Sequence, residues 1–124
     1  MKNVVTSKAP AAIGPYSQGI DIGNLVFTSG QLPLNRDTGE MESDIKAATK
    51  ASLSSENAVL AGAGLTMDNV IKTTVFISDM NNFAAMNEVY ATFFGETAPA
   101  RSCVEVARLP KDVLVEIEAV AVRK

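Results

Sequence analysis

The sequence predicts an α+β fold with the element order βββαβαββ. Segments rich in Val, Ile, Thr and Phe are bounded by Gly, Pro and Asn, which is typical of strands. Two longer segments place their apolar side chains at helical spacing, and each lies between two such strands. Because the chain has 124 residues and shows no linker or low-complexity stretch, we expect a single domain spanning residues 1–124.

The first three strands are expected before residue 31. Residues 2–6 (KNVVT) form a short β-branched stretch. Residues 9–16 (APAAIGPY) predict an ordered loop, because prolines and a glycine interrupt any regular element. Residues 17–30 (SQGIDIGNLVFTSG) contain two extended runs around Gly23-Asn24, a dipeptide suited to a hairpin turn.

A first helix is predicted from about Asp44 to Ala63. Ser43 or Asp44 can cap its N-terminus, and Gly62 or Gly64 can end it. Ala and Ser fill out most of its buried side, and such small residues permit close approach to a sheet. Its apolar stripe consists of Ile45, Leu53, Leu60 and Ala63.

Residues 69–79 (NVIKTTVFISD) are the clearest single strand, because β-branched and aromatic residues dominate them. Asn81 or Asn82 is expected to cap a second helix over residues 83–94, which the segment 95–100 (GETAPA) ends. The helical spacing places one set of side chains in the core: Phe83, Met86, Tyr90 and Phe93 or Phe94.

The last two strands are predicted over about 101–107 and 113–123, paired as an antiparallel hairpin across Leu109-Pro110. Side chains alternate between the two faces of a strand. One face of the last strand is wholly apolar and should lie under the helices: Val113, Val115, Ile117, Ala119 and Ala121. The other face mixes aliphatic side chains with carboxylates, so we expect a second subunit to cover it: Leu114, Glu116, Glu118, Val120 and Val122.

The preceding strand divides in the same way. Val104 and Val106 fit the helix-covered face, which assigns Arg101, Cys103 and Glu105 to the opposite face. In the expected hairpin, a cation and several carboxylates therefore meet at the subunit interface.

Arg101 would then lie near Glu118 or Glu116, and two interpretations stay open. One is an interfacial salt bridge. The other is a pocket in which the guanidinium holds a substrate carboxylate through its two-donor fork, while a glutamate positions water or moves a proton.

The composition excludes several classes of site. The chain contains no histidine and one cysteine, so zinc sites built from Cys and His, Ser-His-Asp triads and an internal disulfide are excluded. A net charge of −3 without a local run of Lys and Arg makes nucleic acid an unexpected partner. The N-terminus (MKNVVTSKAP) lacks the apolar region of a signal peptide and no segment is long enough to span a bilayer, so we expect a cytoplasmic protein with no membrane partner.

Five segments resemble the RidA/YjgF family, the reactive intermediate deaminases, over nearly the whole chain. The last is the most specific, and it resembles the RidA subgroup proper because Arg101, Cys103 and Glu116 are all present in it. The segments are AIGPYSQG (12–19), FTSGQ (27–31), DNVIKTTVFISDM (68–80), FAAMNEVYATFF (83–94) and PARSCVEVARLPKDVLVEIEAVAV (99–122).

This resemblance implies a chorismate-mutase-like fold with one mixed sheet and two helices on its outer face. It also implies a barrel-like homotrimer with active clefts between neighbouring subunits. The implied activity is hydrolysis of 2-imino acids, such as 2-iminobutanoate and 2-iminopropanoate, to 2-oxo acids and ammonia. No cofactor and no metal are expected, because a protonated imine is already electrophilic and needs only an oriented water.

The resemblance also assigns roles to residues. Arg101 would bind the substrate carboxylate, the Cys103 backbone would contribute a hydrogen bond, and Glu116 would orient water and assist proton transfer. A cysteine nucleophile is not expected, since no histidine is present to activate it. Four other residues would contribute to the pocket: Tyr16, Ser29, Gly30 and Asn87.

Two features depart from the family pattern. The loop before Pro99 is short and carries Ala98 where an aromatic residue is common, which bears on substrate preference. Glu56 lies near the apolar stripe of the first helix, at a position that is usually apolar. The competing hypothesis is a trimeric small-molecule-binding or interaction module that keeps the carboxylate cleft without catalysis. Chaperone-like and ribonuclease-like behaviour also occur in the family, and the acidic, histidine-free composition disfavours the second.

Overall fold

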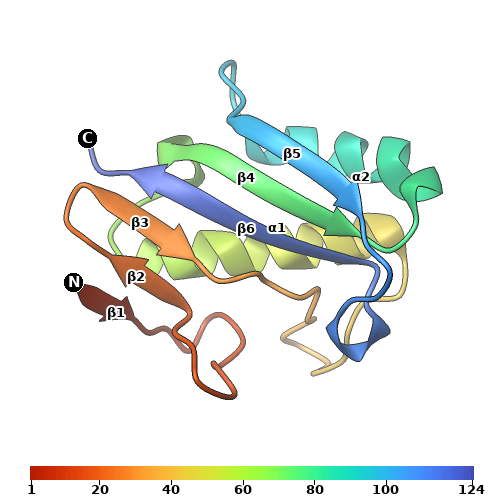
Figure 1. The fold of residues 1–124 in the computed structure, drawn as a ribbon, viewed down its shortest axis with the longest axis horizontal. Helices are drawn as coiled ribbons and strands as arrows, with labels where there is room; N and C mark the ends of the chain where they lie inside the picture. Colours follow the sequence, from red (N-terminus) through yellow and green to blue (C-terminus); the bar gives the residue numbers. More distant parts are fainter.

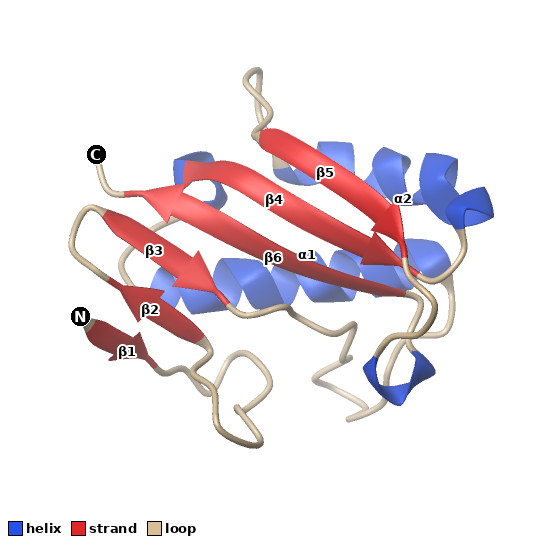
Figure 2. Cartoon of the chain, in the orientation of Figure 1, coloured by secondary structure: helices blue, strands red, loops and turns tan.

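The computed structural model describes residues 1–124 as one six-stranded sheet with both helices on the same face (Figures 1 and 2). The predicted order βββαβαββ is confirmed. Neither helix combines the length and the apolar character needed to cross a membrane. The elements are β1 (Lys2–Val4), β2 (Gly19–Asp21), β3 (Leu25–Thr28), α1 (Ile45–Gly62), β4 (Val70–Ile77), α2 (Phe83–Tyr90), β5 (Ala100–Glu105) and β6 (Val115–Val122).

Local signals set the element boundaries largely as predicted. Gly23 turns the β2–β3 hairpin with φ of 103°, a conformation that favours glycine. Asp44 caps α1 by accepting a hydrogen bond from the Ala47 amide at 3.0 Å, and Gly64 follows the helix with φ of 79°. Of the two predicted caps of α2, Asn82 occupies the N-cap position, but its side chain makes no capping hydrogen bond.

The sheet order is β1-β2-β3-β6-β4-β5, and it overturns the expected hairpin of the last two strands. Strand β4 lies between β5 and β6 and pairs antiparallel with β6 and parallel with β5. A parallel pair needs a crossover connection, which α2 provides. The strands adjacent in sequence are therefore not adjacent in the sheet, and Arg101 does not pair with Glu116 or Glu118.

The predicted assignment of side chains to the two faces of the sheet is confirmed for β6 and wrong for β5. On β6, Val115, Ile117 and Ala119 are buried beneath the helices. On β5, Arg101 and Cys103 are aligned with Thr73 and Val75, which are buried members of β4. Parallel neighbours in register point the same way, so Arg101 and Cys103 lie on the helix side.

The open face of the sheet keeps several apolar side chains in contact with solvent. Val104 is 44% exposed and Phe27 is 43% exposed. Val104 is aligned with Phe76 of β4 and not with the helix-facing residues, which is the reverse of the expected placement.

The core beneath α2 contains its two fully or almost fully buried residues, Met86 and Tyr90. Phe83, Phe93 and Phe94 pack around this cluster, as the helical spacing predicted. The Tyr90 hydroxyl lies 2.7 Å from the Thr73 hydroxyl, so a polar contact fixes α2 to the centre of β4.

Glu56 is a carboxylic acid inside the core between α1 and the sheet. Its side chain is completely buried, and neither carboxyl oxygen has a hydrogen-bond partner. Ser52, one turn earlier on the same side of α1, also has an unpartnered buried hydroxyl. Burial raises the pKa of Glu56 well above its usual value; the nearby Thr28 hydroxyl offsets part of this rise and the charge of Glu118 adds to it.

We predict that Glu56 makes the protein less stable as the pH rises. An unfolded glutamate loses its proton near pH 4.3, whereas the folded chain retains it, and each pH unit between the two pKa values costs about 1.4 kcal/mol. Stability is therefore greatest below the unfolded pKa and levels off above the folded one. Urea unfolding of wild type, Glu56→Leu and Glu56→Gln from pH 5 to 8 measures this dependence.

Glu56→Leu should be more stable than wild type at pH 7, and Glu56→Gln should lose the pH slope while keeping a buried polar group. Parallel pH slopes in all three proteins would show that Glu56 does not titrate within this range.

Candidate functional site

A cavity of about 880 Å³ opens between the loop after β1, the segment after β3 and the start of β6. Apolar residues such as Ile13, Leu32 and Leu34 form part of its wall. Several of its residues with polar or charged side chains, together with Gly30, come from three segments far apart in the sequence: Tyr16, Ser29, Gly30, Lys111, Glu116 and Glu118. We call it the Glu116 cavity. It unites four of the predicted site residues, namely Tyr16, Ser29, Gly30 and Glu116.

Backbone hydrogen bonds hold the segment Ser29–Gln31 against β6. The Gln31 amide donates to the Ile117 carbonyl at 2.8 Å, and the Ile117 amide donates back at 3.3 Å. The Ser29 hydroxyl is occupied, because it donates to the Ser17 carbonyl at 2.5 Å. This pairing brings Gly30 directly onto Glu116, and a Cβ atom at residue 30 would overlap the Glu116 carboxylate. Glycine at residue 30 therefore allows the Glu116 side chain to keep its present position against the main chain.

Gln18 organises the loop on the other side of the cavity and was not singled out from the sequence. Its amide group donates to the carbonyls of Thr6 and Pro10 at 3.0 and 2.8 Å, and its oxygen accepts from the Thr6 amide at 2.7 Å. Gln18 is buried, so it fixes the course of the loop that carries Tyr16. Its place in the SQG run gave no indication of this role.

Glu116 is half-buried and has no hydrogen-bond partner within the chain, so its carboxylate is available to a ligand or water. Burial raises its pKa, and the charge of Glu118 raises it further. The two carboxylates are two residues apart on one face of β6, which places them near enough for their charges to repel. A carboxyl group with a raised pKa gives up and takes back protons closer to neutral pH than an ordinary glutamate does.

A second cluster, which we call the Arg101 cluster, lies at the other side of the sheet under α2. The Arg101 guanidinium donates to Asn87 Oδ1 at 2.6 Å. It also lies 5.4 and 4.8 Å from the ring centres of Phe83 and Tyr90, distances typical of cation–π contacts. These contacts hold the side chain in place while leaving Arg101 only partly buried.

The Arg101 cluster borders a pocket of about 500 Å³. Ala98 and Pro99 form part of its wall, so the short loop noted in the sequence lies beside the guanidinium. Cys103 lies two residues further along β5, and burial raises the pKa of its thiol although the charge of Arg101 lowers it in part. A thiol in this state is a poor nucleophile.

The predicted site residues thus fall into two groups that one chain does not bring together. Arg101 is aligned with Thr73 on the helix side of β4, whereas Glu116 is aligned with Phe76 on the open side. The intervening sheet separates the guanidinium from the carboxylate.

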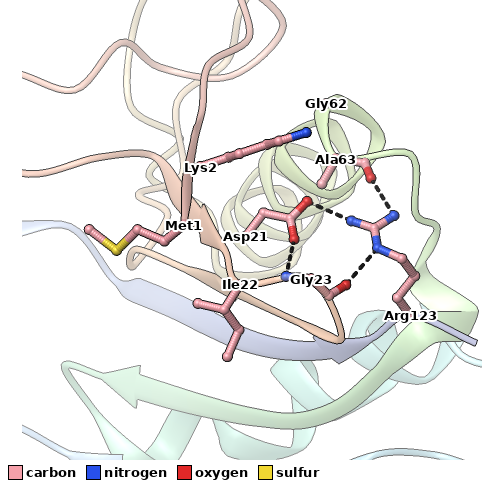
Figure 3. A pocket seen from close by; sticks show the side chains of 8 residues that line it. All are labelled: Met1, Lys2, Asp21, Ile22, Gly23, Gly62, Ala63 and Arg123. Atoms are coloured by element: carbon pink, nitrogen blue, oxygen red, sulfur yellow. Dashed lines mark hydrogen bonds and ion pairs between the residues drawn. The ribbon is translucent and has the colours of Figure 1, made fainter.

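A third pocket, of about 540 Å³, lies at the end of α1 and is a poor candidate (Figure 3). One of its two cationic side chains, Arg123, donates to Asp21 Oδ2, the Gly23 carbonyl and the Ala63 carbonyl at 2.6, 2.8 and 3.0 Å; the other is Lys2. The guanidinium is therefore used to tie the C-terminal strand to the β2–β3 hairpin and α1. No three Cys, Asp or Glu side chains come together as a metal-binding group.

The fold and these residues define a family of small α+β proteins. The family model of Endoribonuclease L-PSP matches residues 6–123. The chain belongs to this family, the RidA/YjgF family that its motifs indicated.

Individual relatives are similar over their whole length. The 2-iminobutanoate/2-iminopropanoate deaminase of Escherichia coli (strain K12) is 55% identical over 126 residues, covering 99% of this chain and 98% of the relative. A RutC family protein of Haemophilus influenzae is 59% identical over 123 residues, covering 96% and 95%. The crystal structure of E. coli TdcF with bound serine has a TM-score of 0.96 at 54% identity and covers 100% of both chains.

We predict that Glu118→Gln lowers the pKa of Glu116. The substitution removes the negative charge that disfavours ionisation of Glu116, while burial continues to raise the pKa. Carbon-13 NMR titration of the glutamate carboxyl groups measures the change, with Glu88→Gln on the exposed side of α2 as the control. An unchanged Glu116 titration in Glu118→Gln would show that the two carboxylates are not coupled.

Proposed function

We propose that this protein is a 2-iminobutanoate/2-iminopropanoate deaminase, which hydrolyses small 2-imino acids to 2-oxo acids and ammonia. The full-length similarity to a relative of that name supports the reaction. The serine bound in the TdcF structure shows that another relative binds a small molecule with a carboxylate. Both requirements of the reaction, a cation for a carboxylate and a group that exchanges protons with water, are present in the chain.

The observation that carries the proposal is the separation of the Arg101 cluster from the Glu116 cavity. Each group is preorganised, and neither is complete. A second copy of the chain resolves this if its Arg101 cluster faces the first copy's Glu116 cavity. The open face of the sheet, with the exposed apolar residues Phe27 and Val104, offers the surface for such an assembly. We infer a chorismate-mutase-like homotrimer with three clefts between neighbours.

The proposed chemistry needs only residues of the two groups. Arg101 binds the substrate carboxylate through its two-donor fork, and Asn87 holds the guanidinium in position. Glu116 takes a proton from water while the water oxygen bonds to the imine carbon. Glu116 then returns this proton to the nitrogen, and the C–N bond breaks with its electron pair leaving on ammonia. The Glu116 carboxylate, ionised again, accepts the hydroxyl proton as the C=O bond forms and passes it to the departing ammonia.

The alternative is a trimeric module that binds small carboxylates without catalysis. Such a module needs Arg101 but has no need of a half-buried, unpartnered Glu116 pressed against Gly30. The position of Glu116 therefore favours the enzyme. The test is release of 2-oxobutanoate and ammonia when a threonine dehydratase generates 2-iminobutanoate in the presence and absence of this protein.

We predict that Arg101 is needed for substrate binding and Glu116 for catalysis. Arg101→Ala should abolish binding of 2-oxobutanoate, and Arg101→Lys should recover little, since an ammonium lacks the planar fork. Glu116→Gln should still bind 2-oxobutanoate but lose about 10²–10⁴-fold in turnover, down to the rate of spontaneous hydrolysis. Calorimetry and the dehydratase-coupled assay measure these effects. Wild-type turnover in Glu116→Gln would remove the acid/base role.

Mixing the two inactive proteins tests whether the cleft forms between copies. In trimers co-refolded from equal amounts of Arg101→Ala and Glu116→Gln chains, about one quarter of the clefts receive an intact Arg101 and an intact Glu116 from different chains. Activity should reappear to that extent. If light scattering finds trimers but the mixture stays inactive, the two groups do not share a cleft.

Cys103 is predicted to act through its backbone alone. Cys103→Ser should retain most of the turnover, because the thiol has a raised pKa and no activating base. The same coupled assay measures it. A loss as large as that of Arg101→Ala would show that the thiol takes part.

A further inference from the structure

Lys111 is one of only two residues other than glycine with positive φ, at 57°, and the second is its neighbour Asp112 at 55°. Both belong to the short turn Pro110–Asp112 that leads into β6. This left-handed conformation brings Cβ close to the following carbonyl, so it is unfavourable for any residue with a side chain. Two such residues in succession need strong constraints from their surroundings.

The turn is held from both ends and across its middle. Leu109 and Val113 are buried on either side of it. Arg108 binds Asp112 with two hydrogen bonds, from Nε to Oδ1 at 2.6 Å and from Nη2 to Oδ2 at 3.1 Å. The Asp112 amide closes the turn on the Leu109 carbonyl at 3.0 Å. The backbone of Lys111 is thus fixed by its neighbours and not by its own side chain.

The Lys111 side chain has no hydrogen bond or ion pair within the chain, and it lines the Glu116 cavity. Only three of the residues that line this cavity are charged: Lys111, Glu116 and Glu118. Without Lys111, the residues that one chain contributes to the cavity would include two carboxylates and no cation, a poor environment for an anionic ligand. The 2-oxo acid product is an anion, and the 2-imino acid substrate also carries a carboxylate.

We propose that Lys111 is a specificity-determining residue of the Glu116 cavity, whose ammonium group offsets the two glutamates and so admits small carboxylates. This inference rests on the proposed function for its choice of ligand. Lys111 affects the entry and binding of the carboxylate ligand, whereas Arg101 of the facing copy binds its carboxylate group directly. This role explains why a lysine occupies a position with positive φ, where glycine would have the lower conformational energy.

Replacing Lys111 by glycine separates the effect of the strained backbone on stability from the effect of the side-chain charge on binding. Lys111→Gly relieves the backbone and removes the charge, so its melting temperature should equal or exceed that of wild type while binding of 2-oxobutanoate weakens. We expect a three- to tenfold rise, roughly, in Kd and in KM at low salt, with kcat nearly unchanged. The difference should shrink as the ionic strength rises, because salt screens exposed charges.

Three further variants complete the test. Lys111→Asn is a second neutral replacement that tolerates the left-handed backbone, and it should match Lys111→Gly in binding. Lys111→Arg restores the charge and should restore binding. Lys50→Ala on α1 changes the net charge of the protein by the same amount outside the cavity, and it should behave as wild type.

The outcomes distinguish this inference from the proposed function. If wild type hydrolyses 2-iminobutanoate and the neutral Lys111 variants keep wild-type Kd and KM at low salt, the role of Lys111 is wrong. If wild type shows no hydrolysis but the neutral variants weaken 2-oxobutanoate binding in a salt-dependent way, the proposed enzyme is wrong and the role of Lys111 stands. A fall in kcat alone would also contradict the inference.

Discussion

The position of β4 between β5 and β6 is the constraint on which the rest of the structure depends. Its two edges hydrogen-bond to both strands that carry the site residues. Through β4, Arg101 is directed toward the helices and Glu116 toward the open face. The position of β4 therefore accounts for two groups, the Arg101 cluster and the Glu116 cavity, that lie on opposite sides of the sheet within one chain.

Each group is organised before any ligand arrives. Gln18 and the Gln31–Ile117 backbone pair fix the walls of the Glu116 cavity, and Gly30 allows the main chain to approach the carboxylate. In the Arg101 cluster, an amide oxygen and two aromatic rings hold a guanidinium that would otherwise have many rotamers. Such preorganisation reduces the entropy lost on binding, which suits a reaction whose substrate is reactive without help.

Two residues are unfavourable where they stand: Lys111 for its backbone conformation and Glu56 for its buried carboxyl group. Lys111 has an unfavourable backbone conformation, and its side chain lines the Glu116 cavity. Glu56 has a favourable helical backbone, but its carboxyl group is buried without a partner in the core, where an apolar side chain would be more stable. The turn around Lys111 holds its backbone in place, whereas no hydrogen bond accompanies the burial of the Glu56 carboxyl group.

The resemblance to the RidA/YjgF family indicated most of the residues in the two groups, whereas the sequence by itself determined the order of the elements, the helix-facing side of β6 and the cap of α1. These follow from neighbours within a few positions, because strand alternation, helical spacing and caps are local properties. The sequence failed on the pairing of β5, the faces of Arg101 and Val104, and the positions of Gln18 and Lys111 beside the Glu116 cavity. Only the tertiary structure decided these, because strand order in a sheet is set by how α2 crosses and packs, and no short segment of sequence records which strand will lie between two others.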